Sequence, residues 1–169
     1  MKEVFSFAII WACTLMVPSI SHAQKTGADS VIFFSKSQTD SIFNGKASTE
    51  RALAFLLGSS QDKEAYLVIL RTKPGDVEIH EQFDDVAIVR SGYAMLKTGN
   101  KVSGHKESGS PGAREWAGGM IEDGKERSLS PGDFVVIPAM LAHQYIPKAG
   151  EPFTYWTIKV RRTKPSNRK

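Results

Sequence analysis

The stretch that decides the fold is Pro131-Gly132-Asp133-Phe134-Val135-Val136-Ile137-Pro138-Ala139-Met140-Leu141-Ala142-His143. Its Pro-Gly pair is typical of a tight turn, and the apolar, β-branched run over residues 134–137 predicts a short strand. Pro138 ends that run, because proline cannot donate a backbone hydrogen bond to a neighbouring strand. A turn, a strand and a second turn within thirteen residues indicate a protein built from short β-strands.

The same pattern recurs on both sides of this stretch. Gly and Pro residues punctuate the chain, and β-branched or aromatic runs lie between them. Short strands at near-regular spacing with turn residues between them predict an all-β sandwich or barrel. We expect further strands over residues 66–70, 77–80, 86–89, 93–97 and 153–160.

Two segments differ from this pattern. Residues 49–57 predict a short N-terminal helix, because their leucines lie at helical spacing and Gly58 is a suitable end. Residues 103–115 are polar and rich in Gly, Ser and Pro, and they predict a loop at one mouth of the barrel.

The stretch from Gly132 to His143 resembles the second motif of the cupin superfamily. That motif is a Gly, five residues, a Pro, one residue, usually a second Gly, then two residues and a His. Met140 stands where the family usually has the second Gly. The resemblance implies a single cupin-type β-barrel, that is, a double-stranded β-helix or jelly roll, in a small exported bacterial cupin.

The stretch from Glu78 to Gly92 is similar to the first cupin motif, which is His-x-His, three or four residues, an acid, six residues and a Gly. Counting back from Gly92 places Asp85 at the acid, His80 at the second His and Glu78 at the first. The resemblance therefore implies a metal site at Glu78, His80, Asp85 and His143, with a Glu in place of one imidazole.

The physical chemistry of these residues supports the same site. Residues 78 and 80 lie two apart on a predicted strand, so their side chains project from one face. Inside a barrel, Glu78, His80, Asp85 and His143 would be costly to bury without partners, and one divalent ion satisfies all four. Two imidazoles and two carboxylates suit Mn, Fe, Ni or Zn.

Two further residues are predicted to line the pocket. Tyr145 shares a strand face with His143. Gln82 lies on the same predicted face as His80, and it would replace Glu78 as a ligand if the register of the motif slipped.

The N-terminus predicts export. A basic start, an apolar run over residues 4–17 and the small-x-small triplet Ser21-His22-Ala23 form a secretory signal peptide with cleavage after Ala23. The only cysteine, Cys13, lies inside it, so the mature chain is expected to hold no disulfide. We therefore expect the periplasm or the extracellular space as its location.

The predicted domain organisation is simple. We expect a signal peptide, an N-terminal arm with the helix, the cupin barrel and a basic flexible tail over residues 1–23, 24–60, 61–160 and 161–169. The net charge of +4 arises from basic residues near the C-terminus rather than from a broad basic face. Together with the lack of a DNA-reading helix motif, this argues against nucleic acid as a partner. A homodimer is expected from the family resemblance.

The predicted function is an exported cupin that binds one divalent metal and acts on a small oxygen-rich organic substrate. The resemblance is compatible with dioxygenase, isomerase and lyase chemistry and does not choose among them, because a fold does not fix a function. The alternative is a non-catalytic small-molecule-binding cupin of the cell envelope, so the sequence leaves open whether the protein is an enzyme.

Overall fold

The computed structural model describes residues 33, 35–41, 52–60, 64–108 and 115–162. The described residues all belong to one compact unit, and the predicted signal peptide lies outside them. Within the described part of the chain, no helix is both long and apolar enough to span a membrane.

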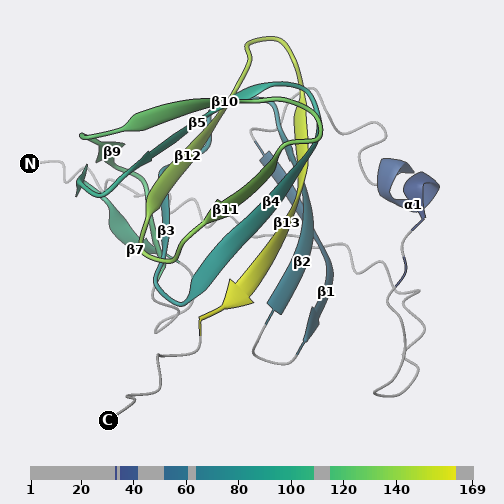
Figure 1. The fold of residues 1–169 in the computed structure, drawn as a ribbon, viewed down its shortest axis with the longest axis horizontal. Coiled ribbons are helices and arrows are strands. Elements are labelled where there is room, and N and C mark those ends of the chain that lie inside the picture. Colours follow the sequence, from purple (N-terminus) through teal and green to yellow (C-terminus); the bar gives the residue numbers. More distant parts are fainter. Residues whose placement is uncertain (1–32, 34, 42–51, 61–63, 109–114, 163–169) are drawn as a thin grey trace, which may run out of the picture. The chain divides into compact units, whose positions relative to one another are not determined.

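The described residues form one short helix and a series of β-strands (Figure 1). The elements are α1 Lys36–Ser41, β1 Ala52–Ser60, β2 Glu64–Arg71, β3 Glu78–His80, β4 Phe83–Ser91, β5 Ala94–Gly99, β6 Val102–Ser103, β7 Lys106–Ser108, β8 Glu115–Ala117, β9 Met120–Ile121, β10 Lys125–Leu129, β11 Phe134–Ile137, β12 Ala142–Pro147 and β13 Phe153–Arg161.

The described strands form two large antiparallel sheets and a small two-stranded sheet of β6 and β9. The five-stranded sheet has the order β1-β2-β13-β4-β11, and the six-stranded sheet has the order β10-β5-β12-β3-β8-β7. The chain changes sheet at each step from β2 to β5 and again from β10 to β13, so the two sheets are wound together. This alternation defines a double-stranded β-helix, and it confirms the predicted all-β, cupin-type barrel.

The main core lies between the two sheets. It gathers apolar side chains from alternate positions of β2, β4, β5, β12 and β13. An aromatic cluster forms its centre, in which the Tyr145 and Tyr155 rings stack 4.7 Å apart and Phe153 packs beside them. These rings close off the space immediately next to the polar site described below.

A second apolar cluster covers the outer face of the six-stranded sheet. Ile79 of β3 and Ala142 of β12 point to this face and pack with Val77 and Ile121. Ile79 therefore points away from its neighbours Glu78 and His80, as the alternation along a strand requires. Apolar contacts on this face hold β3 and β12 in place behind the site.

The predicted helix over residues 49–57 is wrong. Residues from Ala52 onward form β1, which pairs with β2 in a register that runs from Ala52 opposite Arg71 to Ser60 opposite Glu64. Backbone pairing with a neighbouring strand overrides the local helical spacing of the leucines. Gly58 follows a register shift in this strand instead of ending a helix, and the short helix lies earlier, at Lys36–Ser41.

The predicted loop over residues 103–115 contains short strands. Lys106–Ser108 and Glu115–Ala117 pair with each other, and the latter also pairs with β3. Residues 109–114 lie outside the described part of the chain. The pairing with β3 brings the start of β8 beside His80.

Candidate metal centre

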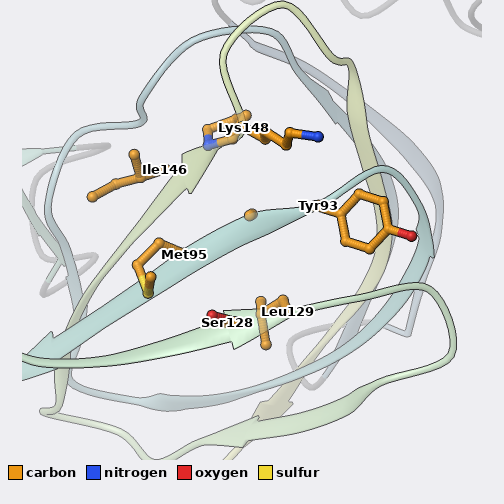
Figure 2. A pocket seen from close by; sticks show the side chains of 8 residues that line it. Tyr93, Met95, Ser128, Leu129, Ile146 and Lys148 are labelled. Carbon is orange, nitrogen blue, oxygen red and sulfur yellow. The ribbon is translucent and has the colours of Figure 1, made fainter.

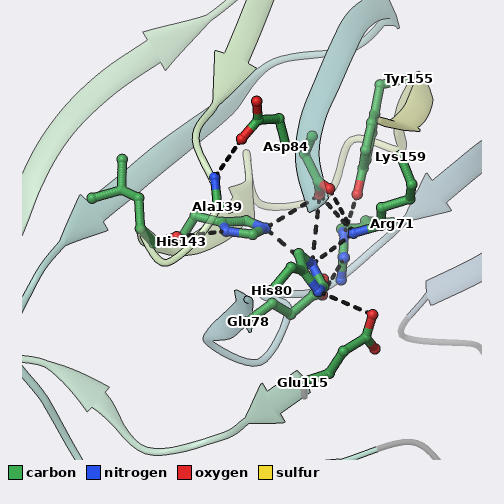
Figure 3. A network of polar contacts seen from close by, with 11 residues as sticks. Arg71, Glu78, His80, Asp84, Glu115, Ala139, His143, Tyr155 and Lys159 are labelled. Carbon is green, nitrogen blue, oxygen red and sulfur yellow. Dashed lines mark hydrogen bonds and ion pairs between the residues drawn. The ribbon is translucent and has the colours of Figure 1, made fainter. Parts of the chain in front are cut away.

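Cross-strand pairing places the predicted ligands on facing strands. Glu78 of β3 lies directly opposite His143 of β12 in the six-stranded sheet. Asp85 of β4 lies directly opposite Lys159 of β13 in the five-stranded sheet. Because the sheets face each other, these two pairs and His80 meet inside the barrel (Figure 3).

The distances in this cluster are short. His80 Nε2 lies 3.6 Å from both Glu78 Oε2 and Asp85 Oδ2. His143 Nε2 lies 3.6 Å from Asp85 Oδ2 and 4.0 Å from Glu78 Oε2. The ligand atoms of Glu78, His80 and His143 all lie within 4.8 Å of one another. The structure therefore brings all four predicted metal ligands together.

Both imidazole rings turn the same nitrogen toward this centre. His80 Nδ1 lies 3.4 Å from Glu115 Oε1, and His143 Nδ1 lies 3.2 Å from the Leu141 carbonyl oxygen. An acceptor beside Nδ1 keeps a proton there, so the lone pair of the neutral ring lies on Nε2. His143 Nε2 is buried and has no hydrogen-bond partner among the described residues.

Two cations enter the cluster from the five-stranded sheet. Arg71 NH2 lies 2.8 Å from Glu78 Oε1, and Arg71 Nε donates a hydrogen bond to the Tyr155 hydroxyl. Lys159 Nζ lies 2.6 Å from His80 Nε2 and 2.7 Å from Asp85 Oδ1. Arg71 forms an ion pair with Oε1 of Glu78, so Oε2 is left to face the two imidazoles.

Sequence reasoning missed Arg71, Glu115 and Lys159. Arg71 directly follows a predicted strand, Glu115 ends a predicted loop, and Lys159 lies at the basic end of the last predicted strand. A signal was present for Lys159, because it lies two residues from Thr157 and four from Tyr155 and therefore shares their inward face.

Neighbouring charges shift the pKa values in the cluster. Burial would raise the pKa of Glu78, but hydrogen bonding to His80 and the Arg71 charge hold it well below its usual range. Burial would lower the pKa of His80, but the Glu115 and Glu78 carboxylates raise it to about 9. Burial lowers the pKa of His143. The hydrogen bond to His80 lowers the pKa of Glu115.

The two predicted pocket residues have different positions. Tyr145 is buried, its ring lies edge-on to His143, and its hydroxyl has no hydrogen-bond partner among the described residues. Gln82 lies in the turn after β3, where its side-chain oxygen accepts a hydrogen bond from Arg161. The strand ends at His80, so Gln82 does not continue its inward face.

The turn before β12 secures the site through its backbone. The Met140 amide donates a hydrogen bond to the His80 carbonyl oxygen at 2.8 Å, and the Ala139 amide donates to Asp84 Oδ1 at 2.6 Å. Met140 has a φ of 71°, which is the left-handed region. The residue that replaces the usual cupin glycine thus keeps a glycine-like backbone conformation.

A pocket of about 520 Å³ lies elsewhere on the molecule (Figure 2). It is lined by Tyr93, Ala94, Met95, Ser128, Leu129, Ile146, Pro147 and Lys148. It shares no residue with the carboxylate and imidazole cluster, and its lysine is paired with Glu151. Because few polar groups converge in it, we assign the chemistry to the cluster and not to this pocket.

The fold is similar to that of solved structures. A protein with a double-stranded β-helix domain from Klebsiella pneumoniae matches with a TM-score of 0.55 and 14% identity over 80% of this chain and 88% of that one. TT1209 from Thermus thermophilus matches with a TM-score of 0.50 and 16% identity over 70% and 90%. A cupin superfamily protein from Desulfitobacterium hafniense matches with a TM-score of 0.46 and 16% identity over 68% and 82%.

No protein-family model matches the sequence, and no curated protein matches it. The likeness to the Klebsiella pneumoniae protein, with its TM-score of 0.55, supports the fold, which is a double-stranded β-helix.

The cluster also has the donor atoms that a divalent metal ion requires. The Nε2 atoms of two imidazoles face two carboxylates. His143 Nε2 has no hydrogen-bond partner among the described residues, whereas the Lys159 ammonium contacts His80 Nε2. Neighbouring ligands of one ion with bonds of about 2.0–2.2 Å lie about 3–3.5 Å apart. The distances of 3.6 and 4.0 Å are slightly longer, so small side-chain rotations suffice to reach one ion.

Proposed function

We propose that this chain binds one divalent metal ion through Glu78, His80, Asp85 and His143 and acts on a small oxygen-rich organic substrate. The observation that carries the proposal is that the Nε2 atoms of both imidazoles each lie within 4.0 Å of both carboxylates, which come from both sheets. The donor set of two nitrogens and two oxygens suits Mn, Fe, Ni or Zn. A bound ion would supply Lewis-acid polarisation of a substrate oxygen.

The chain's own residues prepare this centre. Arg71 keeps Glu78 ionised and fixes its orientation, because it forms an ion pair with the oxygen that faces away from the imidazoles. Glu115 orients the His80 ring through Nδ1. Both interactions are of the kind that fixes metal ligands in place before the ion arrives.

Tyr145 is the residue best placed to bind a substrate oxygen. Burial raises its pKa well above the usual value, so its hydroxyl stays protonated at neutral pH. Its ring contacts His143 at 6.0 Å between centroids, and its oxygen has no partner within the described residues. A buried hydroxyl of this kind can donate a hydrogen bond to a ligand without breaking an internal one.

The proposal includes export. The apolar run and the Ser21-His22-Ala23 triplet support a cleaved signal peptide, which would place the barrel in the periplasm or outside the cell.

Metal content tests the central proposal. The purified protein is analysed by elemental mass spectrometry beside His80→Ala, His143→Ala and the control His105→Ala. His105 is exposed and lies outside the cluster, so this control loses an imidazole without losing a ligand. We expect about one ion per chain in the wild type and the control, and none in the other two variants. Equal metal content in all four proteins would contradict the proposal.

The position of Lys159 favours a second candidate function, which is small-molecule binding without metal. Its ammonium already contacts His80 Nε2 and Asp85, so the cluster has an internal cation. This favours the alternative of a non-catalytic barrel that captures a small molecule without metal. A metal-free protein whose melting temperature does not respond to added Mn, Fe, Ni or Zn would favour this alternative, because ligands that bind the native state raise its stability.

A further inference from the structure

The Lys159 ammonium lies among the atoms that the proposed metal ion would need. Its Nζ is 2.6 Å from His80 Nε2, and 2.7 and 2.8 Å from the two Asp85 carboxylate oxygens (Figure 3). It therefore contacts ligand atoms of both sheets at once. An imidazole Nε2 has a single lone pair, so it can accept a proton donor or bind a metal ion, but not both.

We propose, on the basis of the metal centre proposed above, that Lys159 is a built-in cation that competes with the divalent ion for His80 and Asp85. In the metal-free protein the ammonium occupies the centre. When an ion binds, the ammonium leaves His80 Nε2 and moves toward solvent.

The charges of the cluster favour this exchange. Glu78, Asp85 and Glu115 contribute three carboxylates, against the two cations Arg71 and Lys159. With both imidazoles neutral, as metal ligation requires, these five charged groups sum to −1. A divalent ion that replaces the ammonium brings this cluster to neutrality, whereas an ion added beside it creates an excess positive charge in a buried site, which is costly.

Lys159 is also able to leave. Its side chain is 18% exposed, whereas that of Asp85 is 6% exposed, so the lysine lies closer to solvent than its partner. The next residues along β13, Val160 and Arg161, are exposed. A flexible four-carbon chain lets the ammonium reach water without movement of the backbone.

Competition predicts that removal of the ammonium strengthens metal binding. A site that an internal group occupies binds its ligand more weakly, in proportion to the fraction of time that the site is free. Lys159→Met keeps an unbranched side chain that is one atom shorter and removes its charge. We expect this variant to bind a divalent ion about tenfold more tightly than the wild type does.

Calorimetric titration of the metal-stripped protein with Zn²⁺ and with Mn²⁺ tests this proposal. Wild type, Lys159→Met and the control Lys148→Met are compared at one pH. Lys148 forms an ion pair with Glu151 and makes no contact with the cluster, so this control removes the same charge elsewhere. Tighter binding by Lys159→Met alone supports the proposal, and equal or weaker binding by this variant overturns it.

The same titration separates this inference from the proposed function. If the wild type binds no metal but Lys159→Met does, the result supports competition by Lys159 and contradicts a metal centre in the wild-type protein. If the wild type binds metal and Lys159→Met binds equally, the metal centre stands and the inference fails. If neither protein binds, both fail.

Circular dichroism checks that Lys159→Met is folded, and a second variant is available if it is not. Lys159→Gln keeps an N–H donor for Asp85 without the charge, and it replaces Lys159→Met in the titration if the latter is unfolded. A nuclear magnetic resonance signal from the lysine adds a direct readout. We expect the Lys159 Cε resonance to shift in proportion to bound Zn²⁺, and an unchanged resonance at full occupancy would contradict the exchange.

Discussion

Glu115 Oε1 lies 3.4 Å from Nδ1 of His80, while Nε2 of the same ring faces Glu78 and Asp85. The carboxylate comes from the first residue of β8, which pairs directly with His80 of β3. A short strand between β3 and β7 thus places a carboxylate where it can orient a predicted metal ligand.

Glu115→Gln is expected to weaken metal binding about tenfold, because a carboxylate behind a ligating imidazole fixes the ring and raises its basicity. The pKa of His80 should fall below its present value of about 9. Calorimetry measures the affinity, and a magnetic resonance titration of the imidazole measures the pKa. Glu107→Gln on the neighbouring strand β7 is the control, since Glu107 is exposed. An unchanged affinity in Glu115→Gln would exclude this orienting role.

The stability of the metal-free protein should fall as the pH rises from about 6.5 to about 9. The folded-state pKa of His80 is raised from 6.5 to about 9, so the folded state holds this proton more tightly than the unfolded state does. The stabilisation is fully present below pH 6.5 and is lost as the pH passes through 9. Urea denaturation at several pH values measures this slope, and His80→Ala should abolish it. A slope that persists in the variant would assign the effect to another group.

Metal affinity should rise with pH, whereas the stability of the metal-free protein should fall. A metal ion and a proton compete for His80, so apparent affinity should rise by up to about tenfold per pH unit below pH 9. Burial lowers the pKa of His143, so this second imidazole is already neutral and should add little to the slope at neutral pH. Calorimetric titrations at about pH 6, about pH 7 and about pH 8 measure the effect. A flat profile would show that no ligand loses a proton on binding.

Met140→Gly is expected to stabilise the protein by about 1 kcal/mol. A non-glycine residue in the left-handed region is disfavoured by roughly 1–2 kcal/mol, and the flexibility of glycine in the unfolded chain offsets part of this gain. Met140 has a φ of 71° and its side chain is exposed, so little packing is lost. Chemical denaturation measures the change. Met120→Gly, at an exposed strand position without a positive φ, should instead destabilise the protein.

Two tyrosine hydroxyls next to the site should differ in their contribution to stability. Tyr145→Phe is expected to leave the free energy of unfolding unchanged within about 1 kcal/mol, because its hydroxyl has no partner in the described structure. Tyr155→Phe removes the acceptor of Arg71 Nε and should cost about 1–3 kcal/mol. Thermal or urea unfolding measures both. Equal losses would indicate that the Tyr145 hydroxyl has an internal partner after all.

Most of the strand pattern was predictable because its signals are local. The β-branched run over residues 134–137 lies between turn residues, and it forms a strand with the same limits. The segment at 52–60 was not predictable in the same way. Its leucines also fit a helix, and only pairing with β2, a contact between different strands, decides its structure.

The residues of the candidate site likewise fall into those that a local motif predicts and those that it does not. The spacing of Glu78, His80 and Asp85 within one motif pointed to a shared centre, and the structure brings their side chains together. Glu115 and Lys159 reach this centre from strands that are distant in sequence. No spacing rule relates them to His80, so their roles required the register of β8 and β13.

The ionic contacts of the centre join one sheet to the other. Lys159 and Asp85 belong to the five-stranded sheet, and His80 and His143 belong to the six-stranded sheet. The cation in this centre, whether the ammonium or a metal ion, therefore links the two sheets. A bound metal ion should hold the sheets together more tightly than the ammonium does. Amide hydrogen exchange in β3 and β12 should then slow, because separation of the sheets exposes these amides to solvent.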